Sequence, residues 1–89
     1  MNNFTNDRVF INKEVIVPEV YFKNEGQLKS FPRRMEFSGR EYTFMDGLRY
    51  LVRKGAQMVQ VFDMTDGSRD YRLHFNAGSQ SWTLVDMTM

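Results

Sequence analysis

The stretch Phe44–Gly55, FMDGLRYLVRKG, is the segment around which we expect the fold to be organised. Four apolar residues in it are separated by four, three and one positions: Phe44, Leu48, Leu51 and Val52. That spacing places them on one stripe of an α-helix. Gly55 supplies the positive-φ position at which helices commonly end. The sequence therefore predicts a helix over residues 44–55 whose apolar stripe is covered by a sheet.

Cations gather at the C-terminal end of this predicted helix, at Arg49, Arg53 and Lys54. Each would complement the partial negative charge of a helix end by about 0.3–1 kcal/mol. Gly47 weakens the start of such a helix by about 1 kcal/mol relative to alanine. Tyr50 lies beside the two arginines, and we predict that it is exposed and available to a partner.

Strand patterns surround the predicted helix. Residues 34–37 and 41–44 alternate around Ser38-Gly39-Arg40 and predict a hairpin. Residues 58–65, 69–76 and 81–87 predict a three-stranded meander with turns at Asp66-Gly67 and at residues 77–80. The expected fold is α+β, an antiparallel sheet made of a β-hairpin and a three-stranded β-meander with one helix on one face, in the order ββαβββ. We assign Tyr71, Phe75 and Trp82 to the core face beneath the helix in preference to an exposed base-stacking platform.

The N-terminal third reads differently from this body. Residues 1–8 are polar and predict a frayed end, whereas residues 9–22 are rich in β-branched and aromatic side chains interrupted by Pro18. Residues 24–30 read as a loop. We therefore divide the chain into an N-terminal arm and linker, residues 1–30, able to add a strand, and a compact α+β domain, residues 31–89. The arm residues expected to support self-association are Val15, Val17, Val20 and Phe22.

Composition limits the function. The 89 residues suit one domain, and 12 Lys and Arg against 11 Asp and Glu leave a formal charge of +1, far from the basic balance of a dedicated nucleic-acid binder. The absence of cysteine excludes disulfides and thiolate chemistry and favours a cytoplasmic location. No signal peptide and no run of 18 apolar residues is present, so we expect no membrane association.

Motifs for chemistry are missing. His74 is the single histidine and falls on the polar side of its predicted strand, beside Arg72. Residues 63–68 fail the calcium-loop pattern, because an EF-hand requires glycine at the sixth position, where Ser68 stands. No nucleotide-binding or hydrolase motif occurs. We predict no enzyme activity, no cofactor and no metal site.

The leading hypothesis is a small non-catalytic interaction module that binds a protein partner or self-associates. Its partner-binding candidates are Arg49, Tyr50, Arg53, Lys54, Arg34 and Arg72. One alternative is a nucleic-acid-binding domain that uses an arginine-rich face made of Arg33, Arg34, Arg49, Arg53, Lys54, Arg69 and Arg72. A second alternative is a small-molecule-binding domain with a pocket between helix and sheet.

Overall fold

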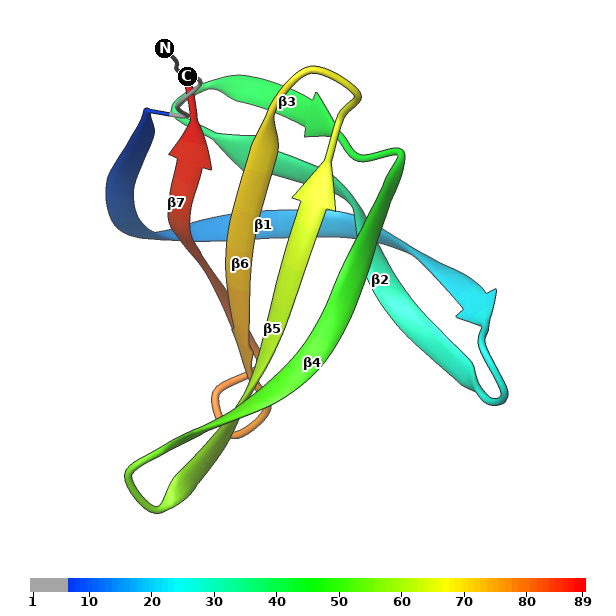
Figure 1. Ribbon diagram of the computed structural model, residues 1–89. Coiled ribbons are helices and arrows are strands. Elements are labelled where there is room, and N and C mark those ends of the chain that lie inside the picture. The colour runs from blue at the N-terminus through cyan, green and yellow to red at the C-terminus, as the bar shows by residue number, and fades with distance from the viewer. Residues whose placement is uncertain (1–6) are drawn as a thin grey trace, which may run out of the picture.

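Every regular element in the described part of the chain, residues 7–89, is a β-strand (Figure 1). In this computed structural model the strands are β1 (Arg8–Asn24), β2 (Leu28–Phe37), β3 (Arg40–Thr43), β4 (Asp46–Lys54), β5 (Gln57–Thr65), β6 (Asp70–Asn76) and β7 (Ser81–Thr88). They form one sheet in the order β3-β2-β1-β7-β6-β5-β4, and all neighbouring strands are antiparallel. The expected α+β fold is therefore wrong, and the chain is all-β over the described residues.

The predicted helix over residues 44–55 is the source of this error. Its central part is strand β4, which pairs with β5 without interruption from Asp46 opposite Thr65 to Lys54 opposite Gln57. Three of the four apolar residues, Phe44, Leu48 and Val52, also fit one face of a strand, and the continuous pairing with β5 decides between helix and strand. Gly55 has the expected positive φ, 63°, but it serves a hairpin turn and not a helix end.

The predicted hairpins and meander are confirmed. Met35 lies opposite Tyr42 in the hairpin of β2 and β3, which turns through two residues of positive φ, Ser38 and Gly39. Strands β5, β6 and β7 lie side by side in the predicted order. Short local turn signals were enough to place these elements because sequence neighbours pair with each other.

The turn after β5 is held by one carboxylate. Asp66 Oδ1 accepts hydrogen bonds from the backbone N–H groups of Ser68, at 2.8 Å, and Arg69, at 2.7 Å. Its other oxygen accepts from the hydroxyl of the buried Tyr71 at 2.6 Å. The turn is thereby anchored to the core, and burial followed by the bond to Asp66 raises the pKa of Tyr71.

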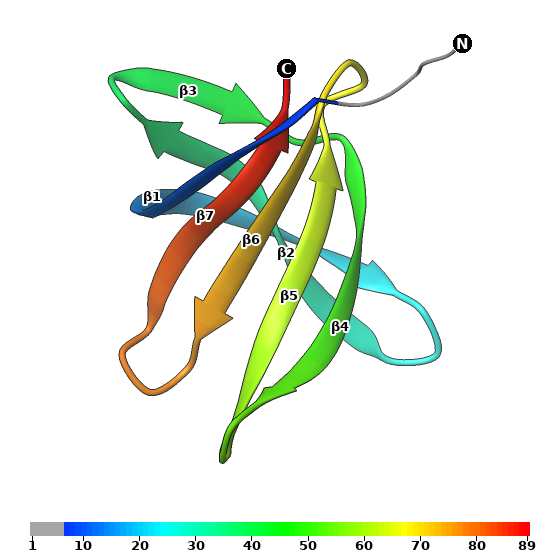
Figure 2. The ribbon, with the colours of Figure 1, turned by 60° about the vertical axis from the view of Figure 1, so that its left-hand side comes forward.

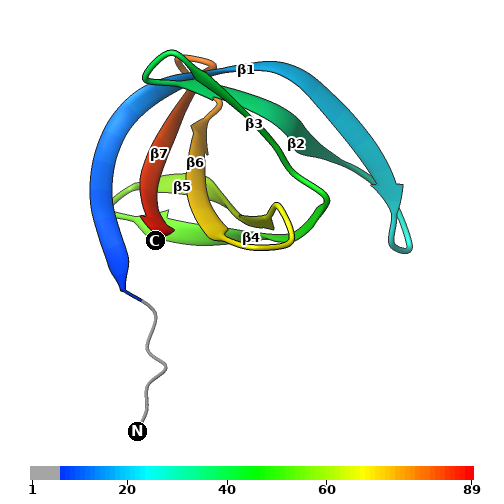
Figure 3. The same ribbon diagram turned by 90° about the horizontal axis from the view of Figure 1, so that it is seen from above.

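Strand β1 runs through the middle of the sheet. Its first half pairs with β7 and its second half with β2, so it sweeps around the molecule (Figure 3). Two irregularities bend it: one lies between Phe10 and Lys13, where Asn12 has a φ of 52°, and the other surrounds Pro18. The predicted arm, residues 1–30, thus supplies a strand to this chain's own sheet. Of the predicted frayed end, residues 1–6 lie outside the described residues, and Arg8 begins β1.

The sheet curls so that its two end strands, β3 and β4, are consecutive in the chain (Figures 1 and 2). The Phe44 N–H donates to the Arg33 carbonyl on β2 at 2.8 Å, and the next N–H, of Met45, donates to the Thr65 carbonyl on β5 at 2.8 Å. Between β3 and β4, the backbone therefore changes its hydrogen-bonding partner from β2 to β5 within two residues. Beyond this point β2 and β4 diverge.

The core lies inside the curl. Ten buried residues form it: Val15, Phe31, Met35, Phe44, Phe62, Met64, Tyr71, Leu73, Leu84 and Met87. Phe75 and Trp82 pack against this cluster with their rings 4.8 Å apart, as expected for a core face. Burial of these apolar side chains, at about 25 cal/mol per Å², is the main force that holds the sheet closed. The radius of gyration is 13.3 Å, against about 12 Å expected for this length, because two hairpins project from the body. No helix among residues 7–89 could span a bilayer.

Candidate functional site

Within residues 7–89, one edge of β4 has no strand partner. Its other edge pairs with β5 over the whole strand, and β2, the nearest strand across the opening, pairs with β3 only at residues 34–37. The tip of the β1–β2 hairpin and the tip of the β4–β5 hairpin point in different directions (Figure 2). An unpaired edge of this kind presents a row of N–H and C=O groups that can pair with another strand.

The direction of these groups follows from the turn. Gly55-Ala56 is a two-residue turn, so its closing pair, Lys54 and Gln57, is hydrogen-bonded. Even-numbered residues of β4 therefore bond to β5, and odd-numbered residues face outward. The Gly47 carbonyl agrees with this, because it accepts a hydrogen bond from Lys23 Nζ of β1 at 3.3 Å, away from β5. The outward backbone groups at the free edge belong to residues 49, 51 and 53.

Large apolar side chains accompany this edge. Leu48 is 68% exposed and Leu51 is 59% exposed, although both lie within a regular strand. Val52 and Tyr50 are partly exposed as well. Arg49 extends over the ring of Phe62, with 5.8 Å from its guanidinium carbon to the ring centroid. Exposed apolar groups on an unpaired strand make this edge the candidate site.

A hollow separates the free edge from the β1–β2 hairpin. Its volume is about 380 Å³, and it is lined by Gln27, Leu28 and Lys29 on one side and by Arg49, Tyr50 and Leu51 on the other. Leu28 is 68% exposed on the far wall. At the start of β4, Lys23 of β1 reaches across to this strand, and its ammonium contacts Asp46 Oδ1 at 2.7 Å. The opening is therefore narrow at Asp46 and wide toward the hairpin tips.

Tyr50 and Arg72, two of the predicted partner-binding residues, meet at Asp63 on the outer face of the sheet. The Tyr50 hydroxyl donates to Asp63 Oδ2 at 2.8 Å, and Arg72 Nε donates to Oδ1 at 2.8 Å. Partial burial raises the pKa of Asp63, but the bonds from Arg72 and Tyr50 outweigh it and hold that pKa below its usual value. Burial, followed by the bond to Asp63, raises the pKa of Tyr50.

This network continues across the sheet. Arg8 on β1 donates two hydrogen bonds to Asp86 on β7, at 2.6 and 2.9 Å, and Asp86 is only 4% exposed. Asp86 lies opposite Arg72, the cation that binds Asp63. Charges of alternating sign thus cross β1, β7, β6 and β5. They pair with each other, so we assign them to structure.

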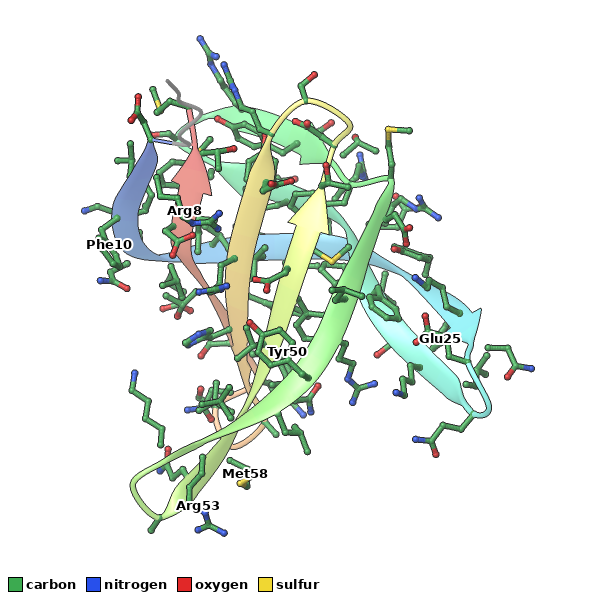
Figure 4. All side chains as sticks on the ribbon, in the orientation of Figure 1. Arg8, Phe10, Glu25, Tyr50, Arg53 and Met58 are labelled. Carbon is green, nitrogen blue, oxygen red and sulfur yellow. The ribbon has the colours of Figure 1, made fainter. Side chains whose placement is uncertain are left out.

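The other predicted partner-binding residues are dispersed. Arg53 lies at the tip of the β4–β5 hairpin with Met58 (Figure 4), and Lys54 adjoins it. Arg34 is elsewhere, on β2, paired with Glu19 at 3.0 Å and Glu41 at 3.2 Å. The structure therefore groups Arg49, Tyr50, Arg53 and Lys54 on one hairpin and separates Arg34 from them.

The residues predicted for self-association divide between two environments. Val15 belongs to the buried core, and Val17 packs against it. Val20 and Phe22 are exposed near the β1–β2 tip, at 43% and 62%. Only the last two are therefore accessible to a second chain.

Leu48 and Leu51 were missed as edge residues because the helical interpretation assigned them to the core. The period-two arrangement of Leu48, Tyr50 and Val52, ending at a glycine turn, was the signal that could have identified this segment as a strand. No sequence pattern around Lys23 indicates its contacts with Asp46 and with the Gly47 carbonyl.

His74 lies on the polar face of β6, as predicted. Burial and the nearby cations Lys54 and Arg72 lower its pKa, so the neutral imidazole is favoured. Among residues 7–89, no three His, Cys, Asp or Glu side chains are close enough together to hold a metal ion. A second hollow, of about 350 Å³, lies on the outer face, and the cations that line it, Arg8 and Arg72, are engaged by Asp86 and Asp63.

Comparison of the chain with protein-family models, curated proteins and solved structures found no match.

Proposed function

We propose that this chain is a small non-catalytic interaction module that binds a protein partner by strand addition at the free edge of β4. The carrying observation is an unpaired edge whose apolar residues Leu48 and Leu51 are exposed within a regular strand. In strand addition, main-chain hydrogen bonds supply affinity and alternate side chains supply specificity. The outward backbone groups of residues 49, 51 and 53 are available for such hydrogen bonds, and the exposed side chains of β4 are available for specific contacts. The cysteine-free composition suits a cytoplasmic location.

Charge favours a partner segment that places no cation directly opposite Arg49, Arg53 or Lys54 of β4. Lys29 and Arg49 line the hollow, and Arg53 and Lys54 lie at the tip of the β4–β5 hairpin. None of these four cations takes part in the ion pairs formed within residues 7–89. Opposite charges across an interface steer encounter and fix register more than they add affinity.

The test uses a displayed library of random linear peptides selected on the immobilised full chain. Peptides that bind are then measured against the wild type, Leu51→Pro and the matched control Leu51→Thr. The Leu51 N–H faces outward, so proline removes an edge donor without removing a bond to β5, whereas threonine keeps the donor. We expect Leu51→Pro to abolish binding and Leu51→Thr to retain most of it. Selected peptides that bind Leu51→Pro as tightly as the wild type would overturn the proposal.

The same four cations make single-stranded nucleic acid the second candidate, since unpaired Lys and Arg attract phosphate. Against it, Phe75 and Trp82 pack on the core and are not presented as a stacking platform. Fluorescence anisotropy of labelled oligonucleotides at about 50 and 200 mM salt tests it, because phosphate-driven binding weakens steeply between these concentrations. Binding that falls with salt and is lost in Arg53→Ala would support nucleic acid, and flat titrations would remove it.

A further inference from the structure

We infer that the partner taken by the free edge is a second copy of this chain, with the two β4 strands paired antiparallel about a twofold axis at Tyr50. The inference rests on the strand-addition function proposed above and names the partner. A twofold pairing requires the same strand to complement itself. The sequence of β4, DGLRYLVRK, meets that requirement in one register.

Backbone direction limits the registers. The outward N–H and C=O groups of β4 belong to odd-numbered residues, as the Gly55-Ala56 turn and the Gly47 carbonyl indicate. In an antiparallel pair, hydrogen-bonded residues face each other directly. Odd residues must therefore oppose odd residues, so the axis passes through a residue and not between two.

Charge then selects among the registers that join seven or more residues of the nine-residue strand. An axis at Arg49 places that arginine opposite its own copy, and an axis at Leu51 places Arg49 opposite Arg53. Like charges directly opposite destabilise a strand pair. The axis at Tyr50 avoids both clashes and places each of the nine residues of the strand opposite a residue of the second copy.

The pairs formed about Tyr50 are complementary. Asp46, whose carboxylate Lys23 contacts within its own chain, faces Lys54 of the second copy at both ends. Leu48 faces Val52 on the outer face. Leu48 and Val52 are 68% and 41% exposed in the single chain, so pairing removes apolar surface from water. Arg49 and Leu51 of the two copies oppose each other, and each of these two pairs exchanges two backbone hydrogen bonds.

Space is available at the free edge. The hollow of about 380 Å³ lies beside Arg49, Tyr50 and Leu51, the three residues about the axis. Lys23 Nζ donates a hydrogen bond to the Gly47 carbonyl and does not contact the outward backbone groups of residues 49 and 51. The unengaged part of the edge therefore coincides with the centre of the predicted pairing.

Variants with a single introduced cysteine report the register of the β4–β4 pair, because the chain has no cysteine of its own. The pair at the axis is not hydrogen-bonded, so its Cα atoms lie about 4.5 Å apart, within the range of about 4.4–6.8 Å that a disulfide spans. We expect Tyr50→Cys to form an oxidised dimer on a non-reducing gel. The matched control Val52→Cys, which faces Leu48, should lose it. A dimer that forms best in Arg49→Cys, Leu51→Cys or Val52→Cys overturns the register.

A charge exchange provides a second test that does not replace Tyr50. Asp46→Lys and Lys54→Asp each create like-charged pairs at both ends of the interface, so each alone should dimerise about tenfold more weakly than the wild type. An equimolar mixture restores opposite charges at both ends. Sedimentation velocity should therefore show dimer in the mixture and less in either variant alone. A mixture that behaves as the sum of its components overturns the inference.

Different results would exclude pairing with a second copy and strand addition in general. If the wild type is monomeric at several hundred micromolar and Tyr50→Cys does not cross-link, the second copy is excluded. Peptide binding that is sensitive to Leu51→Pro would then leave strand addition intact with another partner. Loss of both results would remove the strand-addition function itself.

Discussion

Gly47→Ala gives opposite results for a strand and for a helix at residues 44–55. In the structure, a methyl group on Gly47 would lie 2.7 Å from the backbone oxygen of Asp63 and 2.9 Å from Met64 Cε, and would also contact Met64 Sδ. The end of the Met64 side chain can move. The Asp63 carbonyl belongs to β5, so it moves only if the β4–β5 pairing is distorted.

The size of the effect follows from this contact. Forcing a methyl group into a filled site costs about 1–3 kcal/mol, and the smaller unfolded-state entropy of alanine offsets about 0.4–1 kcal/mol. We expect a net loss of about 1–2 kcal/mol in the free energy of unfolding. In a helix, the same change would instead stabilise by about 1 kcal/mol.

Urea unfolding followed by fluorescence of Trp82, the single tryptophan, measures the difference. With a slope of about 1 kcal/mol per molar urea, the midpoint should fall by about 1–2 M. Gly78→Ala is the matched control, because its added methyl group would meet only Asn76 Oδ1, at 3.2 Å. We expect that control to change stability by less than about 0.5 kcal/mol. A higher midpoint for Gly47→Ala would refute the strand assignment.

Three further predictions concern polar contacts, and urea unfolding measures each. Tyr71→Phe removes the donor to Asp66 and should cost about 1–2 kcal/mol; no loss would show that the bond does not anchor the turn. Arg8→Met leaves the carboxylate of Asp86 buried without its donor and should cost about 1–3 kcal/mol, with partial recovery in Arg8→Lys; equal stability of Arg8→Met and wild type would contradict this. The pKa of Asp63 is lowered in the folded state, so its contribution is present above the unfolded pKa and is lost as pH falls below about 4. The stability gap between wild type and Asp63→Asn should therefore be smaller at pH 3 than at pH 6, and a constant gap would argue against it.

Local signals explain what the sequence could predict about the fold. Asp66-Gly67 and Ser38-Gly39 are turn sequences that join adjacent strands, so the hairpin of β2 and β3 and the meander of β5, β6 and β7 follow from neighbouring residues. Tyr71 alternates with polar residues along its strand, was assigned to the core face, and is buried. These features depend on period-two patterning alone.

Long-range pairing explains what the sequence could not predict. The contact between Arg8 and Asp86 joins residues 78 positions apart, and no pattern near either residue indicates it. Leu48, Leu51 and Val52 fit helical periodicity, whereas Leu48, Tyr50 and Val52 fit strand periodicity. Only the pairing of this segment with β5 decides between the two. The candidate site could not be predicted for the same reason, because a strand edge is free only when no other strand of the fold pairs with it.

The position of β1 has a consequence for how the chain folds. The N-terminal half of this strand has its partner in β7, at the other end of the described chain, whereas its C-terminal half pairs with the adjacent β2. During synthesis the β1–β2–β3 hairpins can form early, but Arg8 to Val15 stay unpaired until residues 82–88 have left the ribosome. Sheets that depend on such distant pairings fold in about milliseconds to seconds, more slowly than helical proteins of similar size. Closure of the sheet by β7 is thus the late event in folding, and until then the first strand is an exposed edge that a chaperone or a neighbouring nascent chain can reach.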